Sequence, residues 1–235
     1  MSRPSVPVVV LAGFLGAGKT TVLNHLLRTG GVGGRARLGV LVNDFGAVNI
    51  DAMLVAGQAD GAVSLTNGCM CCAVDSGGLT AAIGALLRPS SGIDAIVIEA
   101  SGIAEPKALI RMIVGAADAR MHYGGLVYVV DAAHFGAVRR THPELDDHLA
   151  IADLVVLNKC DLISEHDRHV LKQVVEEINS TAPSIEVVDG AVDAQLLFDR
   201  LEYPDSDEAG PRQLTLDELL DETQHASDQC KNNDG

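Results

Sequence analysis

Two groups of residues in this sequence have the types and spacing to do chemistry. Residues 13–21 read GFLGAGKTT, which fits the pattern G-x-x-x-x-G-K-[ST]. Further along, three cysteines lie within four residues, at Cys69, Cys71 and Cys72. The first pattern binds nucleotide phosphates, and thiolates are soft ligands that suit transition metals. Together they suggest that the state of a nucleotide controls the binding of a metal.

The glycine-rich run supplies the parts of a phosphate site. Its glycines let backbone amides turn inward and form an anion-binding nest. Lys19 is expected to reach the β- and γ-phosphates and is predicted to be catalytic, while the hydroxyl of Thr20 would ligate Mg²⁺. The alternative is a glycine-rich turn with a chance lysine. The predicted nucleotide-binding residues of this run are Gly13, Gly16, Ala17, Gly18, Lys19, Thr20 and Thr21.

A second nucleotide contact is predicted at Asn158, Lys159 and Asp161, directly after the apolar stretch 153–157. The two oxygens of the Asp161 carboxylate match the paired N–H donors of guanine. Adenine presents no such pair, so an aspartate here favours GTP over ATP. We expect Asn158 to hold the other edge of the base and Lys159 to pack its stem over the ring. A polar strand-to-helix turn is the alternative interpretation.

Carboxylates for a magnesium ion are expected close to the phosphate loop. The apolar stretch 94–100 contains Glu99 at its end, where a carboxylate would hold Mg²⁺ or its waters. Gly102 could place a backbone N–H against the γ-phosphate, so Glu99 and Gly102 are predicted to be catalytic with Lys19. A first switch is predicted at residues 43–46, with Asp51 after it as a further magnesium ligand. Any one of these carboxylates could instead cap a helix or face solvent.

The cysteine cluster is interpreted as an open metal site. Its spacing is too tight for the paired C-x₂₋₄-C of a structural zinc site, and three local ligands leave a position for another group. A redox thiol pair is one alternative, although the C-x-x-C spacing is missing, and buried small side chains are another. His122 or His134 could complete the metal shell, but a lone histidine is more often structural. Cys160 and Cys230 are interpreted as incidental.

The elements that position these residues follow from the hydrophobic pattern. Apolar stretches alternate with helical patterns, which predicts an α/β fold with a mostly parallel central sheet and helices on both faces. A short apolar run at 62–65 precedes the cysteines. Strands are expected at 6–11, 38–42, 94–100, 125–130, 153–157 and 185–188, and helices at 21–28, 79–87, 107–113 and 165–178.

The composition fits one domain and a charged tail. With 235 residues, 47% of them hydrophobic, the chain can bury one sizeable core. We assign residues 1–201 to a P-loop GTPase domain and residues 202–235 to a flexible tail, which holds ten acidic residues against two basic ones. Residues 213–220 are its one amphipathic piece, which either docks a partner or packs back on the domain.

The charge and the cysteine usage exclude several classes of function. The net charge is −15 and no stripe of lysine or arginine is present, which argues against nucleic acid. No apolar run of 18 residues and no signal peptide are visible, so no membrane contact is expected. Five cysteines in an odd, clustered arrangement indicate the reducing cytoplasm.

These motifs are similar to those of the CobW-type family of P-loop GTPases, relatives of the nickel-insertion GTPases for urease and hydrogenase. The resemblance covers residues 6–200 and implies a cytoplasmic metallochaperone that binds GTP, Mg²⁺ and a transition metal, Zn²⁺ or Co²⁺, through its cysteines. Two departures stand out: Asp44 occupies the position of a usual glutamate, and the family's second, small α/β domain is not recognisable. The carrying motifs are GFLGAGKTT at 13–21, NDFG at 43–46, GCMCC at 68–72, EASGIAEP at 99–106 and NKCD at 158–161.

The sequence thus predicts a GTPase that delivers a metal to a client metalloprotein or metal-dependent enzyme. Hydrolysis of GTP to GDP and phosphate should be slow, because neither an arginine finger nor a glutamine base is identifiable. The main alternative is a regulatory or metal-sensing protein that responds to GTP without delivering metal. A small-molecule kinase or ATPase is a third option, against which residues 158–161 speak. A homodimer bridged by a shared metal also stays open.

Overall fold

The computed structural model describes residues 5–29, 37–42, 62–64, 76–88 and 90–198. Within them, seven strands form one sheet in the order β3-β2-β4-β1-β5-β6-β7, and every neighbouring pair is parallel. The predicted α/β fold with a parallel sheet is confirmed. Several predicted features lie outside the described residues: the first switch with Asp44 and Asp51, the cysteines Cys69, Cys71 and Cys72, the domain boundary at residue 201 and the acidic tail.

The central strands are buried because both faces of the sheet are covered. Strands β2, β4 and β6 are buried at every residue, which explains why they read as continuous apolar runs rather than as alternating patterns. The strands are β1 (Val6–Gly13), β2 (Leu38–Val42), β3 (Ala62–Ser64), β4 (Ala95–Glu99), β5 (Met121–Asp131), β6 (Leu154–Asn158) and β7 (Ser184–Glu186).

Strand β5 begins at Met121 rather than at residue 125 as predicted. Its first residues pair with the start of β1 across a register shift between Val8 and Val9. A Cβ on Gly124 would lie 3.1 Å from the side chain of Pro7, so a glycine lets the two backbones approach closely there. Polar and glycine residues at this end hide the strand from a search for apolar runs.

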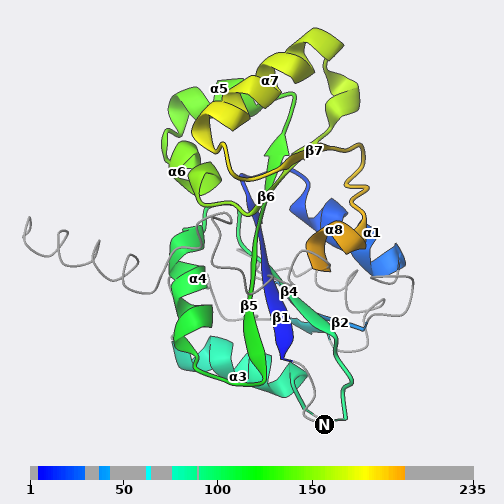
Figure 1. Ribbon diagram of the computed structural model, residues 1–235, viewed down its shortest axis with the longest axis vertical. Helices are drawn as coiled ribbons and strands as arrows, with labels where there is room; N and C mark the ends of the chain where they lie inside the picture. The colour runs from blue at the N-terminus through cyan, green and yellow to red at the C-terminus, as the bar shows by residue number, and fades with distance from the viewer. Residues whose placement is uncertain (1–4, 30–36, 43–61, 65–75, 89, 199–235) are drawn as a thin grey trace, which may run out of the picture. The chain divides into compact units, whose positions relative to one another are not determined.

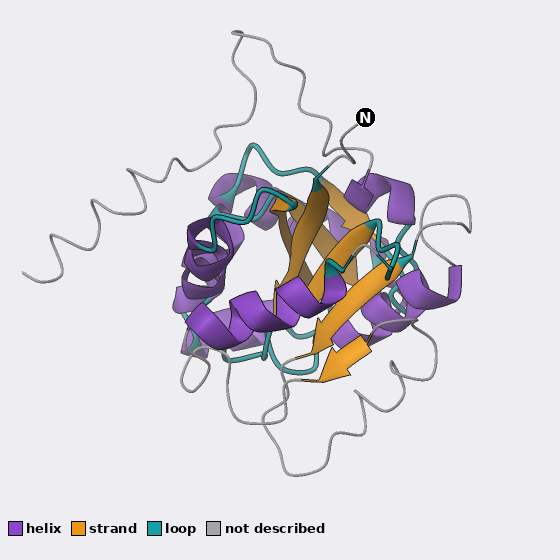
Figure 2. Ribbon diagram, turned by 90° about the horizontal axis from the view of Figure 1, so that it is seen from below, coloured by secondary structure: helices purple, strands orange, loops and turns teal. Residues whose placement is uncertain are grey.

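The helices form one layer on each face of the sheet (Figures 1 and 2). Along β1, Val8 and Val10 join one core cluster while Val9 and Leu11 join the other, as the two-residue period of a strand requires. The first cluster contains side chains of α3 (Ser76–Leu86), α4 (Pro106–Gly115), α5 (Phe135–Thr141), α6 (Glu144–Ala150) and α7 (Glu165–Ile178), and the second those of α1 (Lys19–Thr29) and α8 (Ala194–Phe198).

Local sequence sets the ends of the helices nearest the candidate site. Helix α4 starts at Pro106, and the side chain of Glu105 caps it by accepting from the backbone N–H of Lys107. The sequence did not predict α5 and α6, which are seven residues each and are separated by His142 and Pro143.

Among the helices in the described ranges, none has the length and apolar character that crossing a membrane requires.

Candidate nucleotide-binding site

The loop between β1 and α1 has the geometry of a phosphate cradle. Gly13, Gly16 and Gly18 have φ angles of 146°, 77° and 98°, which other residues adopt only with strain. A Cβ on Gly18 would also collide with the side-chain amide of Asn158. Helix α1 begins at Lys19 and carries no acidic residue in its first turn, so the positive end of its dipole can attract an anion.

Lys19 lies buried at the base of this loop, with 8% of its surface exposed. Its Nζ donates to the carbonyl oxygens of Gly13 at 2.9 Å and Phe14 at 3.2 Å. Burial lowers the pKa of Lys19, and the charge of Glu99 opposes that shift only in part. The two carbonyls carry no net charge and Glu99 compensates the ammonium only in part, so a phosphate would improve the environment of Lys19.

Thr20 and Glu99 form the pair of oxygens predicted to hold magnesium. Glu99 ends β4 beside Leu11 of β1 and is only 6% exposed. The hydroxyl of Thr20 donates to its Oε1 over 2.7 Å. Hydroxyl and carboxylate oxygens are the hard ligands that Mg²⁺ prefers, so the two residues fit this ion.

Gly102 packs directly against the phosphate loop. A Cβ built on it would lie 2.8 Å from the backbone nitrogen of Leu15 and 2.9 Å from its Cα, so a side chain has no room. The preceding strand is fixed to β1, because the N–H of Ala100 donates to the carbonyl of Leu11 at 2.9 Å. The segment after β4 therefore touches the loop that would carry the phosphates, as a nucleotide-sensing segment must.

Asn158 links three loops. It ends β6 and is 2% exposed; its Nδ2 donates to the carbonyl of Ala17 at 3.0 Å, and its Oδ1 accepts from the N–H of Gly190 at 3.0 Å. These contacts tie the base motif to the phosphate loop and to the loop after β7. The contact of this amide with an edge of the base stays a prediction.

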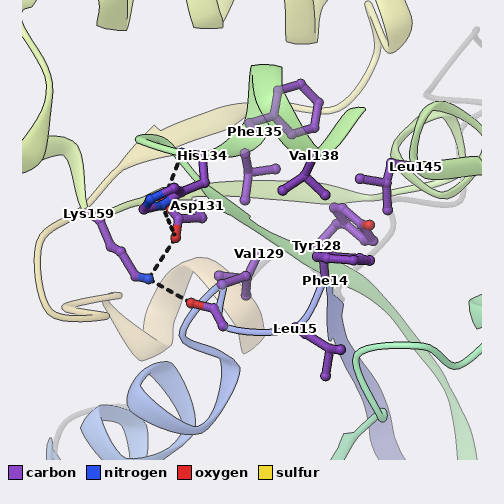
Figure 3. A pocket seen from close by; sticks show the side chains of 13 residues that line it. Phe14, Leu15, Tyr128, Val129, Asp131, His134, Phe135, Val138, Leu145 and Lys159 are labelled. Carbon is purple, nitrogen blue, oxygen red and sulfur yellow. Dashed lines mark hydrogen bonds and ion pairs between the residues drawn. The ribbon is translucent and has the colours of Figure 1, made fainter. Parts of the chain in front are cut away.

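Lys159 and Asp161 follow at the same end of the sheet. Lys159 has left-handed backbone angles, φ 63° and ψ 34°. Its Nζ donates to the carbonyl of Gly16 and to Oδ2 of Asp131, both at 2.7 Å (Figure 3). Asp161 is exposed in the short 3₁₀ turn Cys160–Leu162. Recognition of guanine by Asp161 stays a prediction.

Sequence reasoning missed two residues of this cluster, Asp131 and Gly190. Gly190 has φ 65°, and a Cβ there would lie 2.6 Å from the backbone nitrogen of Val22, so only glycine fits between the loop and α1. The turn dipeptide Asp-Gly after β7 was the available signal for it. Asp131 had no such signal, and only the structure shows that it ends β5 in register with Asn158.

Comparison with known families decides what kind of domain this is. Residues 7–186 match the family described as "CobW/HypB/UreG, nucleotide-binding domain". The chain belongs to this family. The match covers the phosphate loop, Glu99, Asp131 and the base motif, whereas Gly190 lies just beyond it.

Two curated relatives support the assignment to the CobW/HypB/UreG family. The zinc chaperone YjiA of Escherichia coli is 32% identical over 198 residues, which are 82% of this chain and 61% of YjiA. The zinc-regulated GTPase metalloprotein activator 1 of Schizosaccharomyces pombe is 35% identical over 199 residues, 80% of this chain and 47% of that protein. The chain thus spans between about half and three fifths of these relatives.

Solved structures of the family share the fold. The crystal structure of zinc-bound YjiA GTPase from E. coli matches with a TM-score of 0.64 at 22% identity, covering 93% of this chain and 70% of that one. HypB from Helicobacter pylori in complex with nickel matches with a TM-score of 0.59 at 18% identity, covering 84% of each chain. These likenesses confirm the P-loop GTPase fold of the CobW/HypB/UreG domain.

A cavity of about 360 Å³ lies beside the phosphate loop of this domain (Figure 3). At one side the ring of Phe14 packs on that of His142, with centroids 4.6 Å apart, so the loop contacts the α5–α6 corner. Burial raises the pKa of Tyr128, which keeps its hydroxyl neutral. Apolar lining comes from Phe14, Leu15, Tyr128, Phe135, Val138 and Leu145, and polar groups come from Asp131, His134 and Lys159.

The two histidines that could complete the predicted metal shell have hydrogen-bond partners among the described residues. His122 lies near the start of β5 with its Nδ1 2.9 Å from Oγ of Ser5, whereas His134 follows the other end with its Nδ1 3.1 Å from Oδ2 of Asp131. In the part of the chain that the structure describes, no three His, Cys, Asp or Glu residues are grouped to hold a metal. Cys160 is buried and donates to the carbonyl of Leu157, which fits a packing role.

Proposed function

We propose that this chain is the GTP-binding and GTP-hydrolysing part of a metallochaperone. It would bind a transition metal of the zinc or cobalt class through Cys69, Cys71 and Cys72 and pass it to a client metalloprotein. One observation carries the proposal: the nucleotide cluster and the start of the cysteine-bearing segment lie at the same edge of one parallel sheet. The names of the relatives, zinc chaperone and metalloprotein activator, support the choice of metal and of client.

Strand register gives this edge a scale. Glu99 of β4 is aligned with Val42 of β2, which is aligned with Ser64 of β3. Adjacent strands are about 4.8 Å apart, so the backbone of Ser64 lies about 10 Å from that of Glu99. The segment that contains the cysteines begins directly after Ser64. Only two strand spacings therefore separate the predicted phosphate site from the start of the cysteine-bearing segment.

The site residues divide the work on a nucleotide. Lys19 would attract the phosphates, and Asp161 would accept from the N–H donors of guanine. Thr20 and Glu99 would hold Mg²⁺, which when bound neutralises charge on the phosphate oxygens. Gly102, packed on Leu15, would offer its backbone N–H to the γ-phosphate and lose that partner after hydrolysis.

Reciprocity follows from this coupling. If GTP tightens the binding of metal relative to GDP, metal must tighten the binding of GTP by the same factor. The proposal therefore requires a difference in metal affinity between the two nucleotide states. If the affinity for metal were the same with GTP and with GDP, the nucleotide would not control the metal site.

The deciding experiment is a competition titration of Zn²⁺ and Co²⁺ into the reduced protein with Mg²⁺ and either GDP or a non-hydrolysable GTP analogue. We expect tighter metal binding with the analogue. Cys71→Ser should abolish this difference, whereas Cys230→Ser, which changes a cysteine outside the cluster, should preserve it. Parallel titration with an ATP analogue checks the preference for guanine.

Other outcomes would point elsewhere. Equal metal binding in both nucleotide states, with GTP hydrolysis intact, would favour the regulatory or metal-sensing alternative. Preference for the ATP analogue would contradict the role of Asp161 and revive an ATPase or kinase.

A further inference from the structure

The conformation of Lys159 needs support from its surroundings. Left-handed backbone angles cost a residue other than glycine free energy, so contacts must hold them. The ammonium of Lys159 makes two hydrogen bonds of 2.7 Å, to the carbonyl of Gly16 and to Oδ2 of Asp131. The Gly16 carbonyl is neutral, so Asp131 is the charged partner of this lysine.

Asp131 is itself held in place by the backbone. Its Oδ1 accepts from the N–H groups of Ala133 at 3.0 Å and His134 at 3.2 Å, where the chain turns from β5 toward α5. Burial alone would raise the pKa of Asp131, but hydrogen bonds and charge from Lys159 and His134 outweigh it and lower that pKa. A charged group fixed at a strand end can hold a flexible lysine in one place.

We infer that Asp131 is a positioning residue for the nucleotide base: it fixes Lys159 so that the lysine stem forms one wall of the guanine site. This inference rests on the proposed binding of GTP. Figure 3 shows the Lys159 ammonium placed beside the Asp131 carboxylate. Because the same ammonium bonds Gly16, the clamp also sets the base motif relative to the phosphate loop.

The role predicts a specific pattern of nucleotide affinities. The clamp, which is the ion pair between Asp131 and Lys159, acts on the base. Its loss should therefore weaken the binding of GDP and GTP to the same extent. The affinity for a ligand that keeps the phosphates but lacks the base should not change. A merely structural role of Asp131, in the turn that leads from β5 to α5, would instead weaken the binding of every ligand and destabilise the fold.

The substitution Asp131→Asn separates these roles. The amide keeps the size of the side chain and the Oδ1 acceptor for the two backbone donors, but it removes the charge opposite Lys159. Asp153→Asn is the matched control, because Asp153 lies at the opposite end of the β5–β6 pair and Oδ2 of its carboxylate accepts from the N–H of Leu126 at 2.7 Å. Both variants lose one carboxylate, and only one of them faces the nucleotide site.

The test measures binding of GDP, a GTP analogue and magnesium tripolyphosphate to the full chain. Asp131→Asn should weaken the binding of GDP and of the analogue alike by about tenfold, which is the scale of one charge-assisted hydrogen bond. The affinity for tripolyphosphate should stay within about twofold of the wild-type value. Asp153→Asn should leave all three unchanged. In a Lys159→Met background, Asp131→Asn should add no further loss, because the clamp is already broken.

Each other result has a definite meaning. Unchanged GDP affinity in Asp131→Asn, with normal binding by the wild-type protein, would overturn the inference and leave the proposed function standing. An equal loss for tripolyphosphate would also overturn it and assign Asp131 to the fold. Failure of the wild-type protein to bind GDP would overturn the proposed function, and the inference with it.

Discussion

Replacing Asn158 with alanine should weaken both the fold and its response to nucleotide. The amide of Asn158 is the link between the phosphate loop at Ala17 and the loop at Gly190. Alanine would leave the carbonyl of Ala17 and the N–H of Gly190 buried without this partner. Each such group costs about 1–3 kcal/mol, so we expect the free energy of unfolding to fall by about 2–6 kcal/mol.

The nucleotide response should fall as well, because the link holds the base motif to the phosphate loop. GDP at a hundred times its dissociation constant stabilises a protein by about 2.7 kcal/mol. If the variant binds GDP about tenfold more weakly, the same concentration gives only about 1.4 kcal/mol. Urea unfolding with and without GDP and Mg²⁺ measures both quantities in one series.

Asn179 provides a matched control within the same chain. It is also a buried asparagine, 5% exposed, and its Nδ2 donates to the carbonyls of Leu149, Ala150 and Ala152 at the opposite edge of the sheet. Asn179→Ala should destabilise the protein at least as much but keep the full stabilisation by GDP. If Asn158→Ala also kept the full stabilisation by GDP, the coupling assigned to the amide of Asn158 would be refuted.

Three further results are expected. Gly102→Ala should slow GTP hydrolysis by at least about tenfold, since its Cβ would meet the backbone of Leu15, while GDP affinity stays within about twofold; an unchanged rate of phosphate release would contradict this. Burial raises the pKa of Cys160, so iodoacetamide should modify it in urea but not in the folded protein, as peptide mass spectrometry can show. The hydrogen bond from Arg120 lowers the pKa of Asp118 from 3.8 to about 2, so the stability it contributes is complete above pH 3.8 and is lost as the pH falls toward 2. The melting temperatures of wild type and Asp118→Asn should therefore converge in acid, and a constant gap would argue against the shift.

The sequence predicted the central strands well, for a physical reason. Strands β2, β4 and β6 are buried on both faces, so their residues must be apolar throughout and the turns after them stand out. In a parallel sheet the loops after neighbouring strands meet at one edge. This geometry brings Glu99 to Thr20 and Asn158 to Ala17.

What the sequence did not predict depends on contacts between distant residues. Nothing in the four residues 158–161 shows that the amide of Asn158 would hydrogen bond Ala17 and Gly190. Asp131 carries no motif, and its role follows only from the pairing of β5 with β6. Helices α5 and α6 are too short for a periodic pattern to be recognised.

The link through Asn158 also bears on how the protein is made. The phosphate loop emerges early from the ribosome, whereas its partner Asn158 and the third loop, at Gly190, are synthesised much later. Strand β1 likewise lies between β4 and β5, both of which follow it in the chain. Such non-local pairing forms late in folding. A growing chain therefore acquires all the contacts of the candidate nucleotide site only after Gly190 is synthesised. If GTP binds as proposed, it can stabilise the domain only from that point on.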